Sequence, residues 1–274
     1  MTRTRPTLHC PCERRTGATS FTYDAAPAGE TAFDLKGQDY RRTYWRCGIC
    51  RHEFSDHELD LSGLYGGAYV EQTYGPKMRA TFERIIALPP ERSDNAGRVR
   101  RVVDFAVGHF APGIVPRLLD IGAGLGVFPH GMKQAGWNVT ALDPDPQAGR
   151  HLTEVVGVRA VTADFFAVDA ATLGPFDVIT LNKVIEHVEA PVPMLAKAGA
   201  LLAAGGFVYV EVPDVVAAID GPGREEYFIE HHHVFSHASL AMTAERAGLA
   251  VMDLERLREP SGKFTLRGFF AGTP

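Results

Sequence analysis

The sequence predicts an α/β fold, in which a doubly wound, seven-stranded and mostly parallel sheet follows a small N-terminal module. From residue 99 onward, short apolar runs alternate with helical segments, which is the pattern of a parallel sheet covered by helices on both faces. The run RLLDIGAGLGV at residues 117–127 places three glycines between an apolar strand and a helix. All four cysteines fall within the first 50 residues, which marks that segment as a separate unit.

The expected elements alternate regularly along the second part of the chain. Helices are expected near 126–136, 146–156, 191–203 and 236–247. Five strands should form the parallel part of the sheet, at 117–121, 138–142, 158–162, 176–181 and 206–212. The short link at 259–262 (EPSG) joins two further strands, near 250–257 and 263–271, and it predicts an antiparallel hairpin at the sheet edge.

Three segments follow from the composition. Residues 1–60 are polar, carry every cysteine and form a predicted zinc-binding cap. Residues 61–98 hold two tyrosines on an expected helix, an amphipathic stretch at 78–86 and a linker at 89–98. Residues 99–274 contain the sheet. A chain of 274 residues is long enough for one large core and a small accessory module.

The net charge of −5 argues against a protein that binds nucleic acid through bulk positive charge. The N-terminal residues lack the apolar stretch of a secretory signal, and no apolar run approaches the roughly 20 residues of a membrane span. We therefore expect a cytoplasmic protein with a small-molecule substrate and no membrane partner, and we leave the oligomeric state open.

The cysteines form two close pairs, which in a cytoplasmic chain favours metal binding over disulfides. Gly48 permits a tight turn within the second pair. One residue separates the cysteines of the first pair, rather than the usual two to four, so a histidine could replace one thiolate. Four soft ligands leave no open position, which predicts structural zinc; four reduced cysteines without metal are the alternative. The predicted ligands are Cys10, Cys12, Cys47 and Cys50, with His9, His52 and His57 as substitutes.

The glycine-rich turn is expected to bind a ligand. Gly122, Gly124 and Gly126 remove side chains where a ligand would approach, and the following helix offers unpaired N–H groups to a carboxylate or phosphate. A second strand ends in Asp143, 21 positions beyond Gly122, which suits binding to ribose hydroxyls. Asp120 stands where dinucleotide sites usually carry an apolar residue, and it suits a ligand with a cationic amino group. A dinucleotide site and a turn without a ligand are the alternatives.

The pattern Asp120-x-Gly-x-Gly-x-Gly resembles motif I of the class I methyltransferases that depend on S-adenosylmethionine (SAM), and the resemblance covers residues 115–274. It implies the Rossmann-like, seven-stranded sheet of that family and SAM as the cofactor. In the family, an acid after the third strand contacts adenine and a side chain stacks on the ring. The residues that the resemblance assigns to the cofactor are Asp120, Gly122, Gly124, Asp143, Asp164, Phe165 and Asn182.

A histidine-rich segment after the fifth strand, EHHHVFSH at residues 230–237, supplies candidate bases. Glu230 and His231 resemble part of the Glu-His-x-x-Tyr-Phe-Ser stretch of the sugar C-methyltransferases, in which the two residues contact substrate and act in proton abstraction. The two residues before Glu230 differ from that pattern, and the resemblance does not include the group's large C-terminal domain. His187, after the fourth strand, is the second candidate base.

Four further residues are expected to face the substrate: Tyr65, Tyr69, Glu186 and His233. In many small-molecule methyltransferases a tyrosine-bearing helix closes over the methionine end of SAM. The two tyrosines are four positions apart and would share one helical face, either there or in packing the cap onto the main domain. His233 shares an extended-chain face with His231, so a metal clasp with Glu230 or Asp214 is conceivable, and a solvent-facing lid is the alternative.

These features predict methyl transfer from SAM to an oxygen, nitrogen or carbon nucleophile on a sugar or natural-product scaffold, with histidine as the general base. One alternative is an RNA base methyltransferase whose zinc module binds RNA. The balanced charge of the cap and the lack of an Asn/Asp-Pro-Pro-Tyr base clamp after the fourth strand argue against that alternative. The other alternative is a non-catalytic protein that binds SAM or a partner.

Overall fold

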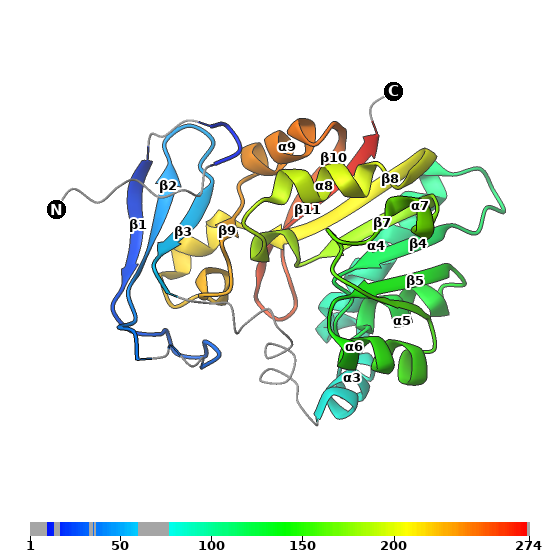
Figure 1. The fold of residues 1–274 in the computed structure, drawn as a ribbon, viewed down its shortest axis with the longest axis horizontal. Coiled ribbons are helices and arrows are strands. Elements are labelled where there is room, and N and C mark those ends of the chain that lie inside the picture. Colours follow the sequence, from blue (N-terminus) through cyan, green and yellow to red (C-terminus); the bar gives the residue numbers. More distant parts are fainter. Residues whose placement is uncertain (1–9, 14–16, 33–34, 36, 60–76, 273–274) are drawn as a thin grey trace.

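The structure is a computed structural model, and it describes residues 10–13, 17–32, 35, 37–59 and 77–272. This part of the chain forms a four-stranded sheet and a seven-stranded sheet (Figure 1). The expected tyrosine-bearing helix with Tyr65 and Tyr69 lies outside the described residues. Among the described helices, none has the length and apolar character that crossing a bilayer requires.

The seven-stranded sheet confirms the predicted fold. Its strand order is β10-β11-β8-β7-β4-β5-β6, and only β10 and β11 run antiparallel to their neighbours. The expected hairpin is present: β11 lies between β10 and β8, and β10 forms the edge. The strands are β4 (Arg117–Ile121), β5 (Asn138–Asp143), β6 (Arg159–Thr162), β7 (Phe176–Asn182), β8 (Leu202–Pro213), β10 (Leu249–Arg258) and β11 (Phe264–Gly272).

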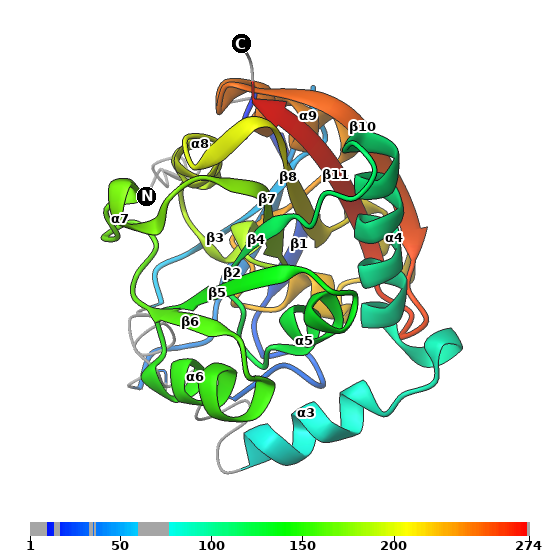
Figure 2. The same ribbon diagram turned by 90° about the vertical axis from the view of Figure 1, so that its right-hand side faces the viewer.

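Helices cover both faces of this sheet (Figure 2). The α-helices are α3 (Met78–Ile86), α4 (Asp94–His109), α5 (Val127–Gln134), α6 (Pro146–His151), α7 (Ala170–Leu173), α8 (Pro191–Gly199) and α9 (His237–Arg246). Short segments of 3-10 helix and one of π-helix (η3) complete the described elements: η2 (Pro90–Arg92), η3 (Leu152–Val156), η4 (Ile185–His187), η5 (Val215–Asp220) and η6 (Glu225–Tyr227). Helices α4 and α5 pack on one face, and α8 and α9 pack on the other.

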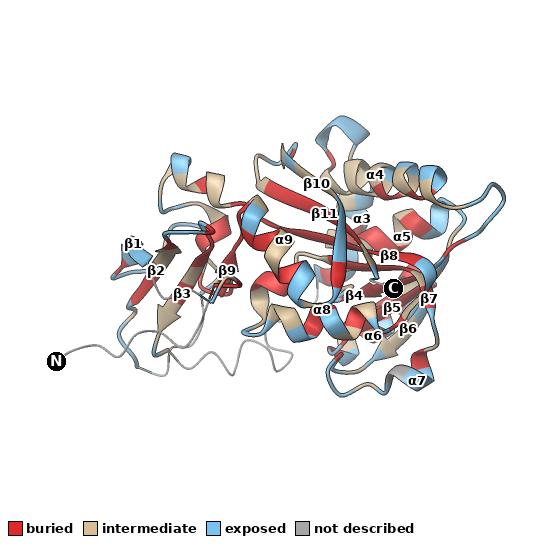
Figure 3. Ribbon diagram, turned by 90° about the horizontal axis from the view of Figure 1, so that it is seen from above, coloured by how far each residue is buried: buried red, intermediate tan, exposed pale blue. Residues whose placement is uncertain are grey.

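Neighbouring residues of one strand serve opposite faces, because side chains alternate along a strand. Leu118 packs with α4 and α5, whereas Leu119 packs with α8 and α9. Both residues are fully buried, as are the centres of β7 and β8 (Figure 3). Burial on both faces explains why these strands appear in the sequence as continuous apolar runs rather than as alternating ones.

Two predicted boundaries are wrong. Helix α4 begins at Asp94, inside the expected linker at 89–98, because the side chain of Ser93 accepts a hydrogen bond from the Ala96 N–H (3.1 Å) and caps the helix. The helix expected at 191–203 ends at Gly199, and β8 starts at Leu202. Alanine and leucine, which occupy residues 200–203, fit either element, and here Leu202 and Ala203 belong to the strand.

The cap forms the second sheet, with strands β1 (Gly17–Tyr23), β2 (Arg42–Cys47) and β3 (Glu53–His57). Its fourth strand is β9 (His233–Val234), which belongs to the histidine-rich segment and pairs antiparallel with β3 (Figure 1). Aromatic rings continue this contact: Tyr44 of the cap meets Tyr227 edge-on at 5.1 Å between centroids. The cap and the segment after β8 therefore form one packed unit, although the sequence placed a boundary at residue 60.

Candidate active site

The glycine-rich turn joins β4 to α5 with three left-handed glycines. Gly122 has φ +71°, and a Cβ there would lie 2.6 Å from a methyl carbon of Val184, so the turn packs closely against the loop after β7. Gly124 has φ +48° and no heavy atom within 4 Å of a Cβ position. Glycine at 122 is needed for packing, whereas glycine at 124 leaves the face of the turn clear for a ligand.

Asp120 is the last residue but one of β4 and is held by side chains from the neighbouring strand β7. Its Oδ1 accepts hydrogen bonds from Thr180 Oγ1 (2.6 Å) and Asn182 Nδ2 (2.8 Å). Burial raises the pKa of Asp120 to about 7, and these two hydrogen bonds act against that rise. A cationic group bound beside the turn would favour the ionised carboxylate.

Asp143 ends β5 and ties the turn to the next strand. One carboxylate oxygen accepts from the Gly124 N–H (2.8 Å), and the other accepts from the Asp145 N–H (2.9 Å). Burial raises the pKa of Asp143, while the two backbone N–H groups lower it. Each carboxylate oxygen has a second lone pair, so these contacts leave acceptor capacity for a ribose hydroxyl.

The residues after β6 take different positions. Asp164 is exposed and accepts a hydrogen bond from the Phe166 N–H (2.9 Å). Phe165, to which the family resemblance assigns stacking on adenine, has its ring in the apolar core, with the Lys197 ammonium 5.3 Å from the ring centroid. Phe166 is the exposed aromatic residue at this edge.

Glu186, His187 and His231 come together beside the turn, from the loops after β7 and β8. One carboxylate oxygen and one ring nitrogen of each histidine lie within 4.8 Å of one another. Each histidine is fixed by a backbone carbonyl: His187 Nδ1 donates to Glu230 O and His231 Nδ1 donates to Glu226 O, both at 3.0 Å. The structure therefore brings both candidate bases to one point.

The environment of this cluster keeps its groups uncharged near neutral pH. Burial lowers the pKa of His187 to about 4, and burial together with the adjacent His187 lowers the pKa of His231. Burial raises the pKa of the Glu186 carboxyl to about 8, against the nearby Lys183 ammonium. Perturbed titratable groups gathered at the ligand edge of an α/β sheet are typical of functional sites.

Two other candidates lie outside this cluster. His233 sits in β9, where its Nδ1 is 3.0 Å from His52 Nε2, so its ring faces the cap rather than sharing a site with His231. Asp214 does not join His231 and His233 in the metal site considered from the sequence, since its carboxylate pairs with Arg256. The side chain of Glu230 lies in the field of Arg42 and Glu30 of the cap, and burial raises its pKa to about 7.

Sequence analysis missed two residues at the site. Thr180 supports Asp120, and its signal is a hydroxyl residue within an otherwise apolar strand. Lys183 has φ +58°, an uncommon conformation for a residue with a side chain, and its ammonium donates to Thr265 Oγ1 (2.9 Å). The role of Lys183 is visible only in the structure, because no sequence pattern indicates its positive φ angle.

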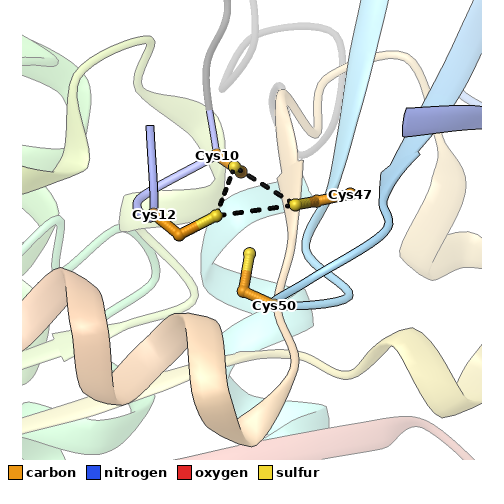
Figure 4. A group of neighbouring side chains, drawn as sticks. All are labelled: Cys10, Cys12, Cys47 and Cys50. Carbon is orange, nitrogen blue, oxygen red and sulfur yellow. Dashed lines mark hydrogen bonds between the residues drawn. The ribbon is translucent and has the colours of Figure 1, made fainter. Parts of the chain in front are cut away.

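The four cysteines converge between the cap and α9 (Figure 4). The Sγ of Cys10 lies 3.0 Å from that of Cys12 and 3.4 Å from that of Cys47, and the four sulfurs lie within 4.8 Å of one another. Thiolates around one zinc ion at about 2.3 Å would be roughly 3.8 Å apart, so the set fits tetrahedral zinc. His52 is not part of this group, since its ring bonds to Ser239 and His233.

The sheet order, the glycine-rich turn and the acids at the strand ends define a class I methyltransferase fold. Residues 77–254, more than half of the chain, match the family model described as a methyltransferase domain, and the chain belongs to this family.

Curated relatives agree with this family. The ubiquinone biosynthesis O-methyltransferase of Caulobacter sp. (strain K31) is 39% identical over 101 residues, which is 34% of this chain and 39% of the relative. The enzyme of the same name from Bordetella avium is 29% identical over 166 residues, or 53% of this chain and 63% of the relative. The chain thus matches between about two fifths and three fifths of these relatives' lengths.

Solved structures share the fold at low sequence identity. Magnesium protoporphyrin IX methyltransferase of Synechocystis PCC 6803 has a TM-score of 0.57 at 14% identity, covering 75% of this chain and 99% of that one. A didemethyltoxoflavin N1-methyltransferase of Burkholderia thailandensis has a TM-score of 0.53 at 21% identity, covering 82% and 96%. Both of those structures contain S-adenosylhomocysteine (SAH), the demethylated product of SAM.

Proposed function

We propose that this protein transfers the methyl group of SAM to an oxygen, nitrogen or carbon nucleophile of a small molecule, such as a sugar or a natural product. The observation that carries the proposal is the arrangement of acids at the carboxyl edge of the sheet. Asp120 and Asp143 flank a turn whose Gly124 face is clear, in a domain of the methyltransferase family. The named relatives are O-methyltransferases of ubiquinone biosynthesis, so an oxygen nucleophile is our first choice.

Each acid has a defined task in this proposal. SAM supplies a methyl group bound to a positively charged sulfur. Asp120, held by Thr180 and Asn182, would bind the amino group of the cofactor's methionine part, and Asp143 would accept from ribose hydroxyls. The two roles fix the cofactor at both ends of the turn, so its methyl group has one direction, and orientation supplies much of the rate of a displacement reaction.

The acceptor would lie beside His187 and His231, with either imidazole as the general base. Both rings hold their Nδ1 proton against a backbone carbonyl, so Nε2 is the atom that would take up the acceptor's proton. Tyr44 of the cap donates to His231 O (2.6 Å), so the cap positions this base. Tyr65 and Tyr69 remain candidates for covering the methionine end of the cofactor.

The cap has a balanced charge, and the similar proteins are named for small-molecule substrates, so an RNA substrate is not favoured.

We also propose that the four cysteines hold one structural zinc ion. A zinc site here would fix the end of β2 and the start of α9, and through them the position of the histidine-rich segment.

Calorimetry with SAH tests the cofactor proposal directly. Wild-type protein should bind SAH, and Asp120→Ala should weaken binding roughly 10- to 100-fold, because a hydrogen bond to a charged group contributes about 1.5–3 kcal/mol. Asp177→Asn is the matched control, since Asp177 sits at the opposite end of β7 and bonds to Arg117. Absence of heat with SAH in the wild-type protein would refute the proposal.

A further inference from the structure

We propose that Glu186, His187 and His231 form a binding site for a divalent transition-metal ion, separate from the cysteine cluster. One carboxylate oxygen and two ring nitrogens converge within 4.8 Å. Ligand atoms bound to one ion at about 2.1 Å lie roughly 3–4.2 Å apart, so small side-chain movements would complete the site. Two histidines and one carboxylate are a known ligand set for divalent iron and zinc.

The Glu186 carboxyl gives the first independent argument. It is fully buried, and neither of its oxygens has a hydrogen-bond partner in the described part of the chain. Burying such a group without a partner is unfavourable, so a native protein normally satisfies it. The Lys183 ammonium, which lowers the pKa of this carboxyl, donates its hydrogen bond to Thr265 instead. A bound cation would supply the interaction that Glu186 lacks.

The hydrogen bonds behind the two histidines give the second argument. Histidine ligands almost always donate their other ring N–H to a carbonyl or carboxylate, which fixes the ring and its tautomer. His187 donates from Nδ1 to Glu230 O, and His231 donates from Nδ1 to Glu226 O. A carbonyl only accepts, so in each neutral ring Nε2 is the nitrogen with the lone pair, and we infer that Nε2 is the ligand atom.

The backbone holds the two ligand loops together. The His232 N–H donates to Glu186 O (2.8 Å), which links the loop after β8 to the loop after β7. The cap adds a third constraint, since Tyr44 donates to the carbonyl of His231. The ligand positions are therefore set by main-chain contacts from three elements rather than by free side chains, as a preorganised metal site requires.

The inference deepens the proposed function. Val184, two residues before Glu186, packs against Gly122, so the site lies beside the turn assigned to the cofactor. The described residues supply three ligands, and a divalent ion has further positions for an acceptor oxygen. An acceptor hydroxyl bound there would release its proton to solvent water more readily, because the cation would stabilise the alkoxide or phenolate that remains, and that oxygen would then take the methyl group from the sulfonium sulfur. In the metal-bound protein the histidines are ligands, and the ion takes over activation of the acceptor.

Cobalt(II) separates this site from the cysteine cluster. The full-length protein is first saturated with one equivalent of zinc, which the soft thiolates prefer. Titration with cobalt chloride should then produce weak visible d–d absorption that saturates at one ion per chain, without the intense charge-transfer bands of cobalt thiolates. No cobalt-dependent absorption in zinc-saturated wild-type protein would overturn the proposal.

Single variants assign the ligands. Glu186→Gln and His231→Asn should each weaken cobalt binding roughly tenfold or more. His232→Asn is the matched control, because it removes the adjacent imidazole and should bind cobalt like the wild type. Equal cobalt affinity in all three variants and the wild type would overturn the assignment.

SAH calorimetry on the same proteins serves two purposes. Retained SAH binding in Glu186→Gln and His231→Asn shows that these variants are folded, so their loss of cobalt is local. The cobalt titration uses no SAM and no acceptor. Failure of the metal proposal with intact SAH binding is thus distinguishable from failure of the cofactor proposal.

Discussion

Thr180 and Asp120 face each other across the neighbouring parallel strands β7 and β4, and the hydroxyl of Thr180 donates to the carboxylate at 2.6 Å. Both side chains are buried. A buried carboxylate needs such donors to remain ionised, and Asp120 has one from Thr180 and one from Asn182. The sheet itself therefore prepares the acid that we assign to the cofactor.

Thr180→Val should shift the pH dependence of SAH binding. The hydrogen bond from Thr180 lowers the pKa of Asp120, which burial raises to about 7, so its loss raises that pKa further. If the ionised form of Asp120 binds the cofactor's amino group, SAH affinity should fall as the pH is lowered, and in the variant this loss should begin at a higher pH than in the wild type. Dissociation constants measured by calorimetry between pH 6 and 9 would check this.

The same change elsewhere in the sheet provides the control. Thr140 is buried in β5 opposite Leu119. Thr140→Val replaces a hydroxyl by a methyl group, as Thr180→Val does, but away from the Asp120 carboxylate. It should leave the pH profile of SAH binding where it is in the wild type. An identical profile for Thr180→Val would mean that Asp120 does not bind the cofactor's amino group.

Gly122→Ala should destabilise the protein more than Gly124→Ala. Both positions have positive φ, which costs a residue with a side chain about 1–2 kcal/mol. At Gly122 the new methyl group would also lie 2.6 Å from Val184, whereas at Gly124 it meets no atom within 4 Å. The midpoint of thermal unfolding should therefore fall further for Gly122→Ala.

A double variant isolates the steric part of that effect. Val184→Ala removes the methyl groups that the new side chain would strike, so it should restore part of the stability of Gly122→Ala. Purely additive losses in the two single variants and the double variant would contradict the contact between Gly122 and Val184.

The fold was predictable from sequence because its signals are local. The central parallel strands β4, β5 and β7 are short, mostly buried apolar runs, and each has an acid or an amide at or next to its carboxyl end, as at Asp120, Asp143 and Asn182. Such patterns depend on neighbours within a few residues. The same locality explains the errors at Ser93 and Gly199, where residues that suit several conformations were decided by packing.

The candidate site was only partly predictable, because it depends on contacts between distant segments. His231 and His187 were both candidates, but no pattern could show that they meet Glu186 at one point. Strand β9 is two residues long and exists only because β3 lies beside it, so the orientation of His233 toward the cap had no sequence signal. Phe165 has an aromatic ring that could stack on adenine, but its ring lies in the apolar core.

Stability should fall on mild acidification, and the His52–His233 pair should contribute to that fall together with the other buried histidines whose pKa is lowered. The rings join two sheet segments through a bond of 3.0 Å between Nε2 and Nδ1, and both are buried. Burial lowers the pKa of His233 to about 4 and also lowers that of His52, from an ordinary value of 6.5. The unfolded chain thus binds more protons from about pH 6.5 down to 4, and the free energy of unfolding decreases as pH falls through that window.

His52→Gln should make that decrease shallower, since one of the two buried rings no longer titrates on unfolding. Urea unfolding at pH 7.0, 6.0 and 5.0 measures the slope. His109→Gln, on α4 and away from the cap, should keep the wild-type slope. A slope that is the same in all three proteins would rule out the pair as the source of acid sensitivity.

Removal of metal from the cysteine cluster should loosen the cap while sparing the cofactor site. The carbonyl of Cys50 accepts a hydrogen bond from Ser236, the capping residue of α9, and Arg246 of the same helix donates to Pro11 O (2.9 Å). The cluster thus supports the segment that carries His231, whereas the turn at Gly124 depends on β4 and β5.

Elemental analysis of wild-type protein should find one zinc ion per chain, and Cys47→Ser should lower the zinc content and the unfolding temperature. The affinity of Cys47→Ser for SAH should remain within about twofold of the wild type, because the residues that we propose to contact the cofactor lie in the seven-stranded sheet. An acceptor should show a raised KM in this variant, since the histidine-rich segment that we propose faces the acceptor loses its support. If Cys47→Ser lost SAH binding together with its zinc, the cluster would have to support the proposed cofactor site as well as the cap.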